Sequence, residues 1–292
     1  MSGRKKILII ANPFSGTSKK TDLDTMIDKG LDHSRYEADL AFTNYAGHGH
    51  ILAKEGSSTY DIIVAVGGDG TVNEVASGII GSDTVLGILP AGSGNGFAMH
   101  LGLGRNTYKA FAMLNKGKTQ WVDTCSVNGR FFINVSGIGF DARIAYLTKL
   151  NKKRGFMHYL NTTLSQANKF KALPLTIETD DVILEGKFAA AVIANASMYG
   201  YNFTIAPTAA LDDGLFDIML IQEAPVYKYF FTSYRFLNKT LHQSPLVINR
   251  KSKHVKIIIS ENDYYHVDGE GFEMNDNLNF NILQKSMQVI CL

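Results

Sequence analysis

The feature that most constrains the fold is an apolar β-type run that ends in a glycine-rich turn and continues as a helix-type pattern. The run DIIVAV, residues 61–66, leads into GGDGT, residues 67–71. A helix that starts here leaves its first backbone N–H groups unpaired, and these groups together with the helix dipole attract anions. Because glycine has no side chain, an anion can approach the main chain closely. The stretch indicates either a phosphate-binding turn or an ordinary tight strand-to-helix turn, for which glycine is also usual.

A second turn of the same kind follows the next apolar run. Residues 85–89, VLGIL, lead into Pro90 and the loop AGSGNG, residues 91–96, before another helix-type stretch. Ligands gather beyond the carboxyl ends of parallel strands, so two such loops at neighbouring strand ends predict one shared nucleotide site. Polar residues that follow two further strands are expected at the same edge: Asn12, Ser15, Gly16 and Thr43.

The rest of the chain shows two different patterns. Over the first 120 residues, β-type runs alternate with helix-type segments, which indicates an α/β unit with a largely parallel sheet. From about Trp121, short β-type runs are joined by turn residues, and Asp180-Asp181 is predicted to be a hairpin tip. The second half is therefore expected to be a mostly antiparallel domain.

Two helix-type stretches interrupt the second half, at residues 141–166, with a break at Arg154-Gly155, and at residues 226–241. The boundary near Trp121 is a change of pattern without a Pro or Gly linker. We expect a nucleotide-binding α/β domain over residues 1–121 and a second domain over residues 122–285.

Composition and charge exclude several classes of protein. With 29 Lys and Arg against 27 Asp and Glu, the net charge of +2 is too balanced to suggest nucleic-acid binding. Cys125 and Cys291 fit no zinc or disulfide spacing, so both are interpreted as small core residues. No apolar run approaches the roughly 18 residues that span a bilayer, and the first run breaks at Asn12-Pro13, unlike a signal peptide. We expect a cytoplasmic protein without a transmembrane segment.

Standard nucleotide fingerprints do not explain the glycine turns. No GxxxxGK[ST] string occurs, which excludes a Walker-type loop. A GxGxxA string at Gly137, Gly139 and Ala142 lies in the antiparallel half, where no βα unit with a ribose-binding acid follows it. We interpret this string as a chance match.

Several motifs together resemble the diacylglycerol kinase and sphingosine kinase family, in particular its small bacterial lipid kinases. GGDGTVNE (67–74) is partly shared with NAD kinases, whereas the PxGSGN loop (90–95) and VDGE (267–270) resemble the lipid kinases. The resemblance covers nearly the whole chain, because further strings occur in family order: NPFSG, TxxxGHG, WVDTCSVNG, NVSGIGFDA and LDDGLFD.

The resemblance implies an NAD-kinase-like α/β domain, a C-terminal antiparallel β-sandwich that takes the lipid substrate, and ATP in the cleft between them. It implies that residues 286–292 return to the first domain and that Glu270 is the general base for the lipid hydroxyl. Asp213, with the main-chain carbonyls of Ala210 and Leu215, matches a Mg²⁺ site. Combined with the turn analysis, the expected nucleotide contacts are Asn12, Thr43, Gly67, Gly68, Asp69, Gly70, Thr71, Val72, Asn73, Gly92 and Ser93.

One position departs from the bacterial diacylglycerol kinase pattern. Those proteins carry Asn-Asp where this chain has Asn95-Gly96, and their aspartate joins a network behind the metal. Gly96 supplies no carboxylate, which brings the loop nearer to the sphingosine kinase form and leaves open which lipid is phosphorylated. Asp123 is an alternative member of that network.

The lipid side offers two signals. The aromatic stretch 226–237 is interpreted as a buried core helix, with a helix at a membrane surface as the alternative. Lys149, Lys152, Lys153 and Arg154 form a basic cluster that fits anionic headgroups or a solvated helix end equally well.

The leading hypothesis is an ATP- and Mg²⁺-dependent lipid kinase that phosphorylates a hydroxyl of a diacylglycerol, sphingoid or related lipid. Its partner would be a lipid at a membrane surface, with a peripheral position at the inner membrane and a homodimer as options. The alternatives are an NAD kinase and a non-catalytic nucleotide-binding protein of the same fold.

Overall fold

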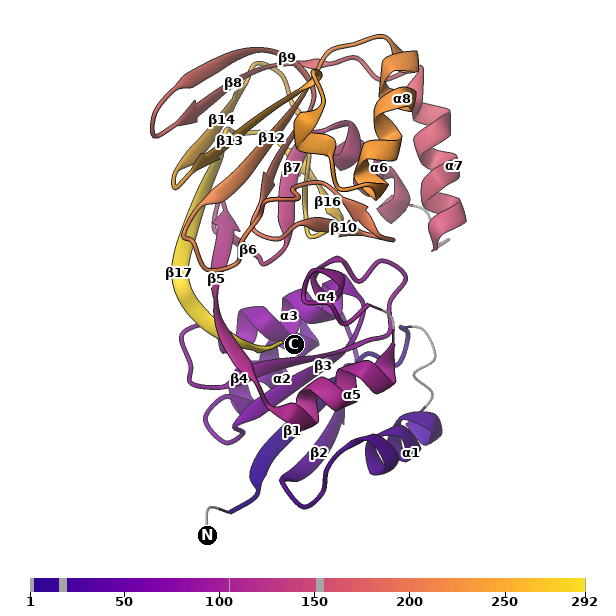
Figure 1. Cartoon of the computed structure of the whole chain (residues 1–292), viewed down its shortest axis with the longest axis vertical. Coiled ribbons are helices and arrows are strands. Elements are labelled where there is room, and N and C mark those ends of the chain that lie inside the picture. Colours follow the sequence, from indigo (N-terminus) through magenta and orange to yellow (C-terminus); the bar gives the residue numbers. More distant parts are fainter. Residues whose placement is uncertain (1–2, 16–19, 105, 151–154, 292) are drawn as a thin grey trace. The chain divides into compact units, whose positions relative to one another are not determined.

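The computed structural model of the chain describes residues 3–15, 20–104, 106–150 and 155–291. The chain divides into two compact units, the first made of Met1–Thr124 and Gln284–Leu292 and the second of Cys125–Leu283. Figure 1 shows the strands and helices of each unit.

The first unit contains a parallel sheet. Its strands lie in the order β4-β3-β1-β2, and the end of a long last strand, β17, pairs in parallel with β4. All six residues of β3 are buried, as expected for a central strand that is covered on both faces. The strand bounds are β1 (Lys5–Ala11), β2 (Tyr36–Phe42), β3 (Ile62–Gly67), β4 (Val85–Pro90) and β17 (Leu278–Ile290).

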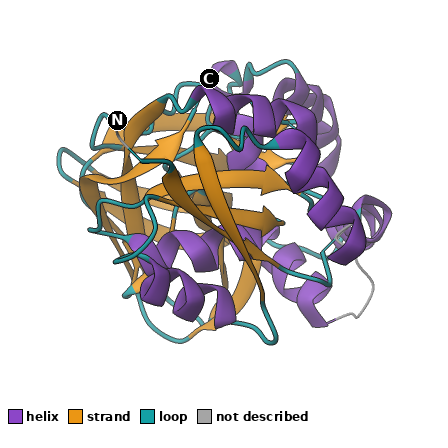
Figure 2. Cartoon of the chain, turned by 90° about the horizontal axis from the view of Figure 1, so that it is seen from below, coloured by secondary structure: helices purple, strands orange, loops and turns teal. Residues whose placement is uncertain are grey.

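Helices cover this sheet on both sides (Figure 2). They are α1 (Lys20–Gly30), α2 (His48–Gly56), α3 (Asp69–Ile79), α4 (Gly96–His100) and α5 (Thr107–Lys116). In α5 the Asn106 side chain accepts a hydrogen bond from the Lys109 N–H (3.1 Å) at one end, and Gly117 ends the helix at φ 66°. The helix buries an apolar stripe that includes Phe111 and Leu114. The sheet alternates with helices along the chain, which confirms the predicted α/β unit.

The second unit is built from antiparallel strands. Their order is β16-β15-β7-β9-β8-β14-β17, and β12 pairs with both β9 and β13. The bounds are β5 (Thr119–Val127), β6 (Arg130–Phe132), β7 (Val135–Gly139), β8 (Leu173–Thr179), β9 (Ile183–Ala194), β10 (Met198–Gly200), β11 (Phe203–Thr204), β12 (Phe216–Gln222), β13 (Val247–Ser252), β14 (Val255–Ile259), β15 (Asp263–Val267) and β16 (Glu270–Met274). β8 and β9 form a hairpin around Asp180-Asp181, as predicted.

Strand β9 explains how the second unit is layered. Its last seven residues are all buried. Ile193 contributes to one core, in which Phe132, Phe216 and Phe280 pack with ring centroids 6.2 Å apart. Val192, on the other face of the strand, contributes to a second core. Cores on both faces make β9 the central strand of this unit. Cys125 and Cys291 are free and buried, as predicted.

Three helices and a short 3₁₀ turn accompany these strands: α6 (Phe140–Leu150), α7 (Phe156–Ala167), α8 (Val226–Leu237) and η1 (Leu241–Gln243). The interpretation of α8 as a buried core helix is wrong, because only Thr232 of its twelve residues is buried. Its aromatic stripe faces outward. None of the helices in the described ranges is both long enough and apolar enough to cross a bilayer.

Candidate functional site

The two glycine turns touch each other. A Cβ atom placed on Gly92 would lie 2.3 Å from the Gly68 Cα, which no real packing tolerates. At the first residue of the second loop, the Ala91 N–H donates to the Gly67 carbonyl (2.9 Å). Strands β3 and β4 are therefore joined where they end, and glycine is required at Gly92 because another backbone lies against it.

Asp69 ties the second turn to the first. Its carboxylate accepts hydrogen bonds from the N–H groups of Asn95 (2.9 Å) and Gly96 (2.7 Å), at the start of α4. These are charge-assisted bonds, so they fix the second loop firmly on the first. The Asp69 carboxylate thus holds the start of α4 and the end of the second loop in place.

Asn95 closes the second loop on itself. It is nearly fully buried and has φ 55° and ψ 46°, a left-handed conformation that Asn adopts more readily than most residues. Its side chain accepts from the Gly92 N–H (3.0 Å) and donates to the Gly92 carbonyl (2.8 Å). Sequence reasoning missed this role, although Asn between two glycines is a signal for such a turn.

The glycines of the first turn have different reasons to be glycine. A Cβ on Gly67 would lie 2.4 Å from the Thr71 Oγ1, so packing explains Gly67. Thr71 is itself buried and lies 3.4 Å from the Asn12 Nδ2 at the end of β1. Gly70 is exposed, and a Cβ there would meet nothing within 4 Å. Folding therefore leaves Gly70 unexplained, and it is the position where a ligand best accounts for the absence of a side chain.

The remaining strand ends place further predicted residues at this edge. Thr43 follows β2, is buried, and its N–H donates to the Ala11 carbonyl (2.9 Å). Val72 is buried, which leaves its main chain as the part that can meet a nucleotide. Asn73 is half-buried and Ser93 exposed. Gly16 lies outside the described residues.

Sequence reasoning also missed what Glu74 does. Its carboxylate accepts from the N–H groups of Gly47 (2.7 Å) and Gly49 (3.0 Å), at the start of α2. The Glu74 side chain of α3 thus bonds to unpaired backbone N–H groups at the start of α2, and it holds α2 beside α3. The sequence does contain both partners, an acid three residues after Thr71 and the GHG string at residues 47–49. Because these are far apart in sequence, their pairing could not be predicted from it.

In the second unit, Glu270 stands at the start of β16, directly after a two-residue hairpin turn. Asp268 (φ 47°) and Gly269 (φ 84°) both have positive φ, as a type I′ turn requires. The Asp268 carboxylate accepts three backbone N–H groups, from Ile133 (3.1 Å), Asn134 (2.9 Å) and Val135 (3.0 Å). The turn that carries Glu270 is thus anchored to the β6–β7 connection.

Glu270 forms an ion pair with Lys149 of α6, with 2.7 Å between Nζ and Oε1. The side chains are 45% and 56% exposed, for Lys149 and Glu270 respectively, so the pair is worth no more than about 1 kcal/mol and a hydroxyl group can compete for the carboxylate. Gly271 lets β16 approach α6, since a Cβ there would lie 2.3 Å from the Tyr146 backbone nitrogen. Of the predicted basic cluster, Lys149 is committed to this pair, and residues 152–154 lie outside the described residues.

At the turn predicted to bind magnesium, the carboxylates are paired with the ammonium group of Lys251. The Asp213 carboxylate accepts from the Leu215 N–H (3.1 Å) and pairs with the Lys251 Nζ (2.7 Å), which also lies 3.1 Å from the buried Asp217 carboxylate. Burial raises the pKa of Asp217, against the effects of Thr208 and Lys251. Burial opposes the charge on Lys251, but the two carboxylates outweigh it and raise its pKa.

The donor set of this turn fits magnesium chemically, because Asp213 and the main-chain carbonyls of Ala210 and Leu215 are all oxygen ligands. A metal ion at Asp213 would have to displace the Lys251 ammonium from one carboxylate oxygen. Among the described residues, no group of three or more His, Cys, Asp or Glu side chains could hold a metal ion. Asp123, the alternative network member, is fully buried and accepts from the Lys285 N–H (2.7 Å).

A polar cluster in the second unit, formed by the buried His266 and the half-buried Asp141 and Tyr199, was not anticipated. Asp141 at the start of α6 accepts from the Tyr199 hydroxyl (2.6 Å) and lies 3.0 Å from the His266 Nε2. Burial, followed by the charge of Asp141, raises the pKa of Tyr199 well above its usual value. His266 lies on β15, which pairs with β16 in the hairpin that carries Glu270.

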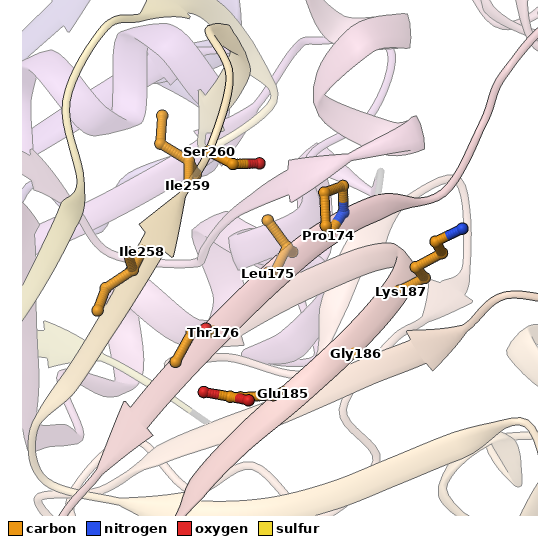
Figure 3. A pocket seen from close by; sticks show the side chains of 9 residues that line it. All are labelled: Pro174, Leu175, Thr176, Glu185, Gly186, Lys187, Ile258, Ile259 and Ser260. Carbon is orange, nitrogen blue, oxygen red and sulfur yellow. The ribbon is translucent and has the colours of Figure 1, made fainter.

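The GxGxxA string has a packing explanation. A Cβ on Gly137 or Gly139 would lie 2.7 Å or 2.5 Å from a carbonyl oxygen of β9. These glycines therefore allow β7 and β9 to approach, which agrees with a chance match. A separate hollow of about 400 Å³ lies over β8, β9 and β14 (Figure 3). Its lining, from Pro174 to Ser260, contains none of the predicted site residues.

Comparison with known proteins identifies both halves of the chain. The diacylglycerol kinase catalytic domain matches residues 6–127, and the YegS C-terminal NAD kinase beta sandwich-like domain matches residues 134–291. A diacylglycerol kinase of Bacillus subtilis is 30% identical over 273 residues, 91% of this chain and 90% of the relative. A diacylglycerol kinase of Staphylococcus epidermidis is 32% identical over 277 residues, 91% of this chain and 86% of the relative.

The fold is similar to that in the crystal structure of a diacylglycerol kinase from Bacillus anthracis. The TM-score is 0.77 at 22% sequence identity, and the match covers 100% of this chain and 98% of the other. The family models, the sequence relatives and the fold agree. The chain belongs to the diacylglycerol kinase family and is a lipid kinase.

Proposed function

We propose that the chain transfers the γ-phosphoryl group of ATP to a lipid hydroxyl, with the phosphates of ATP held by the main chain of the two glycine turns. The observation that carries this proposal is the contact between Gly68 and Gly92, combined with the open position at Gly70. Phosphoryl transfer depends on positioning and on neutralising charge, and a fixed set of backbone N–H groups at a helix start serves both purposes.

Glu270 is the proposed general base. Its carboxylate is more than half exposed, sits on an anchored turn, and is held by an ion pair that a substrate hydroxyl can replace. A positioned base of this kind contributes roughly 100- to 10,000-fold in rate. The proton leaves the lipid hydroxyl for Glu270 as the hydroxyl oxygen attacks the γ-phosphorus and ADP departs.

The proposed cofactor is Mg²⁺, which when bound neutralises charge on phosphate oxygens, and its proposed ligands are Asp213 and the carbonyls of Ala210 and Leu215. Diacylglycerol is the first substrate to test, because the named relatives at 30% and 32% identity are diacylglycerol kinases. Sphingoid bases are tested as well, because Gly96 makes the loop more similar to that of the sphingosine kinases.

The experiment uses purified full-length protein, radiolabelled ATP and Mg²⁺, with diacylglycerol, a sphingoid base or NAD as acceptor. We expect a phosphorylated lipid and no NADP. Glu270→Gln should lower kcat at least 100-fold with ATP binding unchanged. Glu273→Gln, on the same strand, is the matched control, because glutamine can still accept from the Tyr146 hydroxyl. Phosphorylated NAD without lipid product, or equal rates for Glu270→Gln and wild type, would contradict the proposal.

A further inference from the structure

The outward face of α8 is apolar although the helix lies at the surface. Five of its residues occupy one face at helical spacing and are each 50% to 75% exposed: Tyr227, Phe230, Phe231, Tyr234 and Leu237. A helix on a water-soluble surface normally turns such a stripe toward the core. Here the stripe faces away from it.

Contacts on the inner face fix this orientation. Tyr229 donates its hydroxyl to the Gln222 carbonyl (2.9 Å) and accepts from the Ala224 N–H (2.6 Å). Thr232 is the buried residue of the helix, and Phe236 meets Phe203 edge to face at 6.4 Å. The helix therefore packs on the rest of the unit through its other face, and these contacts leave the aromatic stripe exposed.

Helix α7 extends the same kind of surface. All of its residues are described and none is buried. Met157 and Leu164, seven positions apart and so on one face, are 63% and 64% exposed. The β10–β11 hairpin connects the two helices, since Tyr201 at its turn contacts Phe156 of α7 (5.0 Å) and Phe203 contacts α8. Figure 1 shows both helices on one flank of the second unit.

We call these seven residues the α7–α8 surface: Met157, Leu164, Tyr227, Phe230, Phe231, Tyr234 and Leu237. Large contiguous apolar surfaces on soluble proteins mark docking sites. The charge of the surrounding sequence indicates what docks.

Both helices lie in stretches of sequence that contain no acid. Residues 142–177 include seven Lys or Arg and no Asp or Glu, and residues 224–260 also include seven and none. The whole chain is nearly balanced, at 29 basic against 27 acidic residues, so these two stretches are locally basic in sequence. Lys228 and Arg235 stand on α8 itself. An apolar aromatic face within a cationic segment complements the headgroup region of an anionic bilayer.

We propose that the α7–α8 surface docks the protein on an anionic membrane, with the aromatic side chains among the headgroups and acyl chain ends. The inference deepens the proposed function and rests on it in one respect, that the substrate is a bilayer lipid. Docking requires neither ATP nor turnover, so it is tested separately from catalysis.

The test measures binding of the full-length protein to vesicles by co-sedimentation without nucleotide. One set contains phosphatidylcholine alone, and the other contains phosphatidylglycerol as well. We expect wild type to bind the anionic vesicles more tightly. The double variant Phe230→Ser/Phe231→Ser should bind both sets about tenfold more weakly or worse, a change of about 1.4 kcal/mol. Tyr108→Ser, at a 79% exposed residue of α5, is the matched control and should bind like wild type.

Charge and oligomeric state complete the test. Lys228→Gln/Arg235→Gln should reduce the preference for anionic vesicles and leave binding to phosphatidylcholine unchanged. Far-UV circular dichroism checks that the variants are folded. Unchanged vesicle binding by the phenylalanine variant would overturn the proposal. A wild-type dimer that the same variant converts to a monomer, with vesicle binding unaffected, would assign the surface to a second copy of the chain. Vesicle binding that depends on Phe230 and Phe231 supports the surface even if no lipid is phosphorylated.

Discussion

Replacing Asp268 by Asn tests whether the turn beside Glu270 is held by a carboxylate. Asn adopts positive φ readily and suits a type I′ turn, so the substitution leaves the backbone unstrained. One amide oxygen can still accept from Asn134 and Val135, but the amide NH₂ would face the Ile133 N–H, which bonds to the other carboxylate oxygen. Losing one charge-assisted bond and weakening two should cost about 2 to 3 kcal/mol.

Hydrogen exchange and kinetics measure the two consequences of this change. Amides 133–135 should exchange at least tenfold faster, and urea unfolding of the second unit should shift to lower concentration. Because Glu270 follows this turn, kcat for lipid phosphorylation should fall about tenfold or more. Asp181→Asn, at the exposed tip of the β8–β9 hairpin, should change stability by less than about 0.5 kcal/mol. Unchanged exchange at 133–135 in the Asp268 variant would contradict the role assigned to the Asp268 carboxylate.

Two further predictions concern buried charge. Lys251→Met leaves the buried Asp217 without its ammonium partner and should lower the free energy of unfolding by about 2 kcal/mol. The loss is smaller than for a fully buried pair, because the Lys251 side chain is 34% exposed. Equal urea midpoints for this variant and wild type would contradict the prediction. Burial lowers the pKa of His100 to about 4, so the unfolded chain takes up a proton below its usual value of 6.5 before the folded chain does. Stability should therefore fall by up to about 3 kcal/mol between pH 6.5 and 4, and His100→Gln should remove this part of the pH dependence, whereas the same slope in both proteins would count against it.

The sequence predicted the parts of the fold that depend on local pattern. Alternating β-type and helix-type segments identified the parallel α/β unit, and short strands with turn residues identified the antiparallel half. The two glycine turns were predicted to end adjacent strands, and β3 and β4 are neighbours whose turns meet at Gly68 and Gly92. These inferences succeeded because the spacing of apolar residues and the positions of glycines depend directly on backbone geometry.

Side-chain pairing and orientation could not be predicted in the same way. The aromatic stripe of α8 has the same spacing whether it faces the core or solvent, so its direction depended on contacts that Tyr229 and Phe236 make elsewhere. The Lys149–Glu270 and Lys251–Asp213 pairs join residues far apart in sequence. The contact of Asp69 with the nucleotide stays a prediction, and sequence reasoning missed that its carboxylate bonds to the second loop.

The most direct test of the phosphate site is the ATP affinity of Gly70→Ala, measured by calorimetry beside urea unfolding, with Gly92→Ala for comparison. An added methyl group at Gly92 collides with the Gly68 backbone and should lower the free energy of unfolding by about 1 to 3 kcal/mol. At Gly70 it meets no protein atom, so unfolding should be unchanged or more costly by up to about 1 kcal/mol, since Ala favours a helix. If the ATP phosphates lie against the main chain at Gly70, Gly70→Ala nevertheless binds ATP at least tenfold more weakly, and wild-type affinity in this variant would contradict this phosphate site.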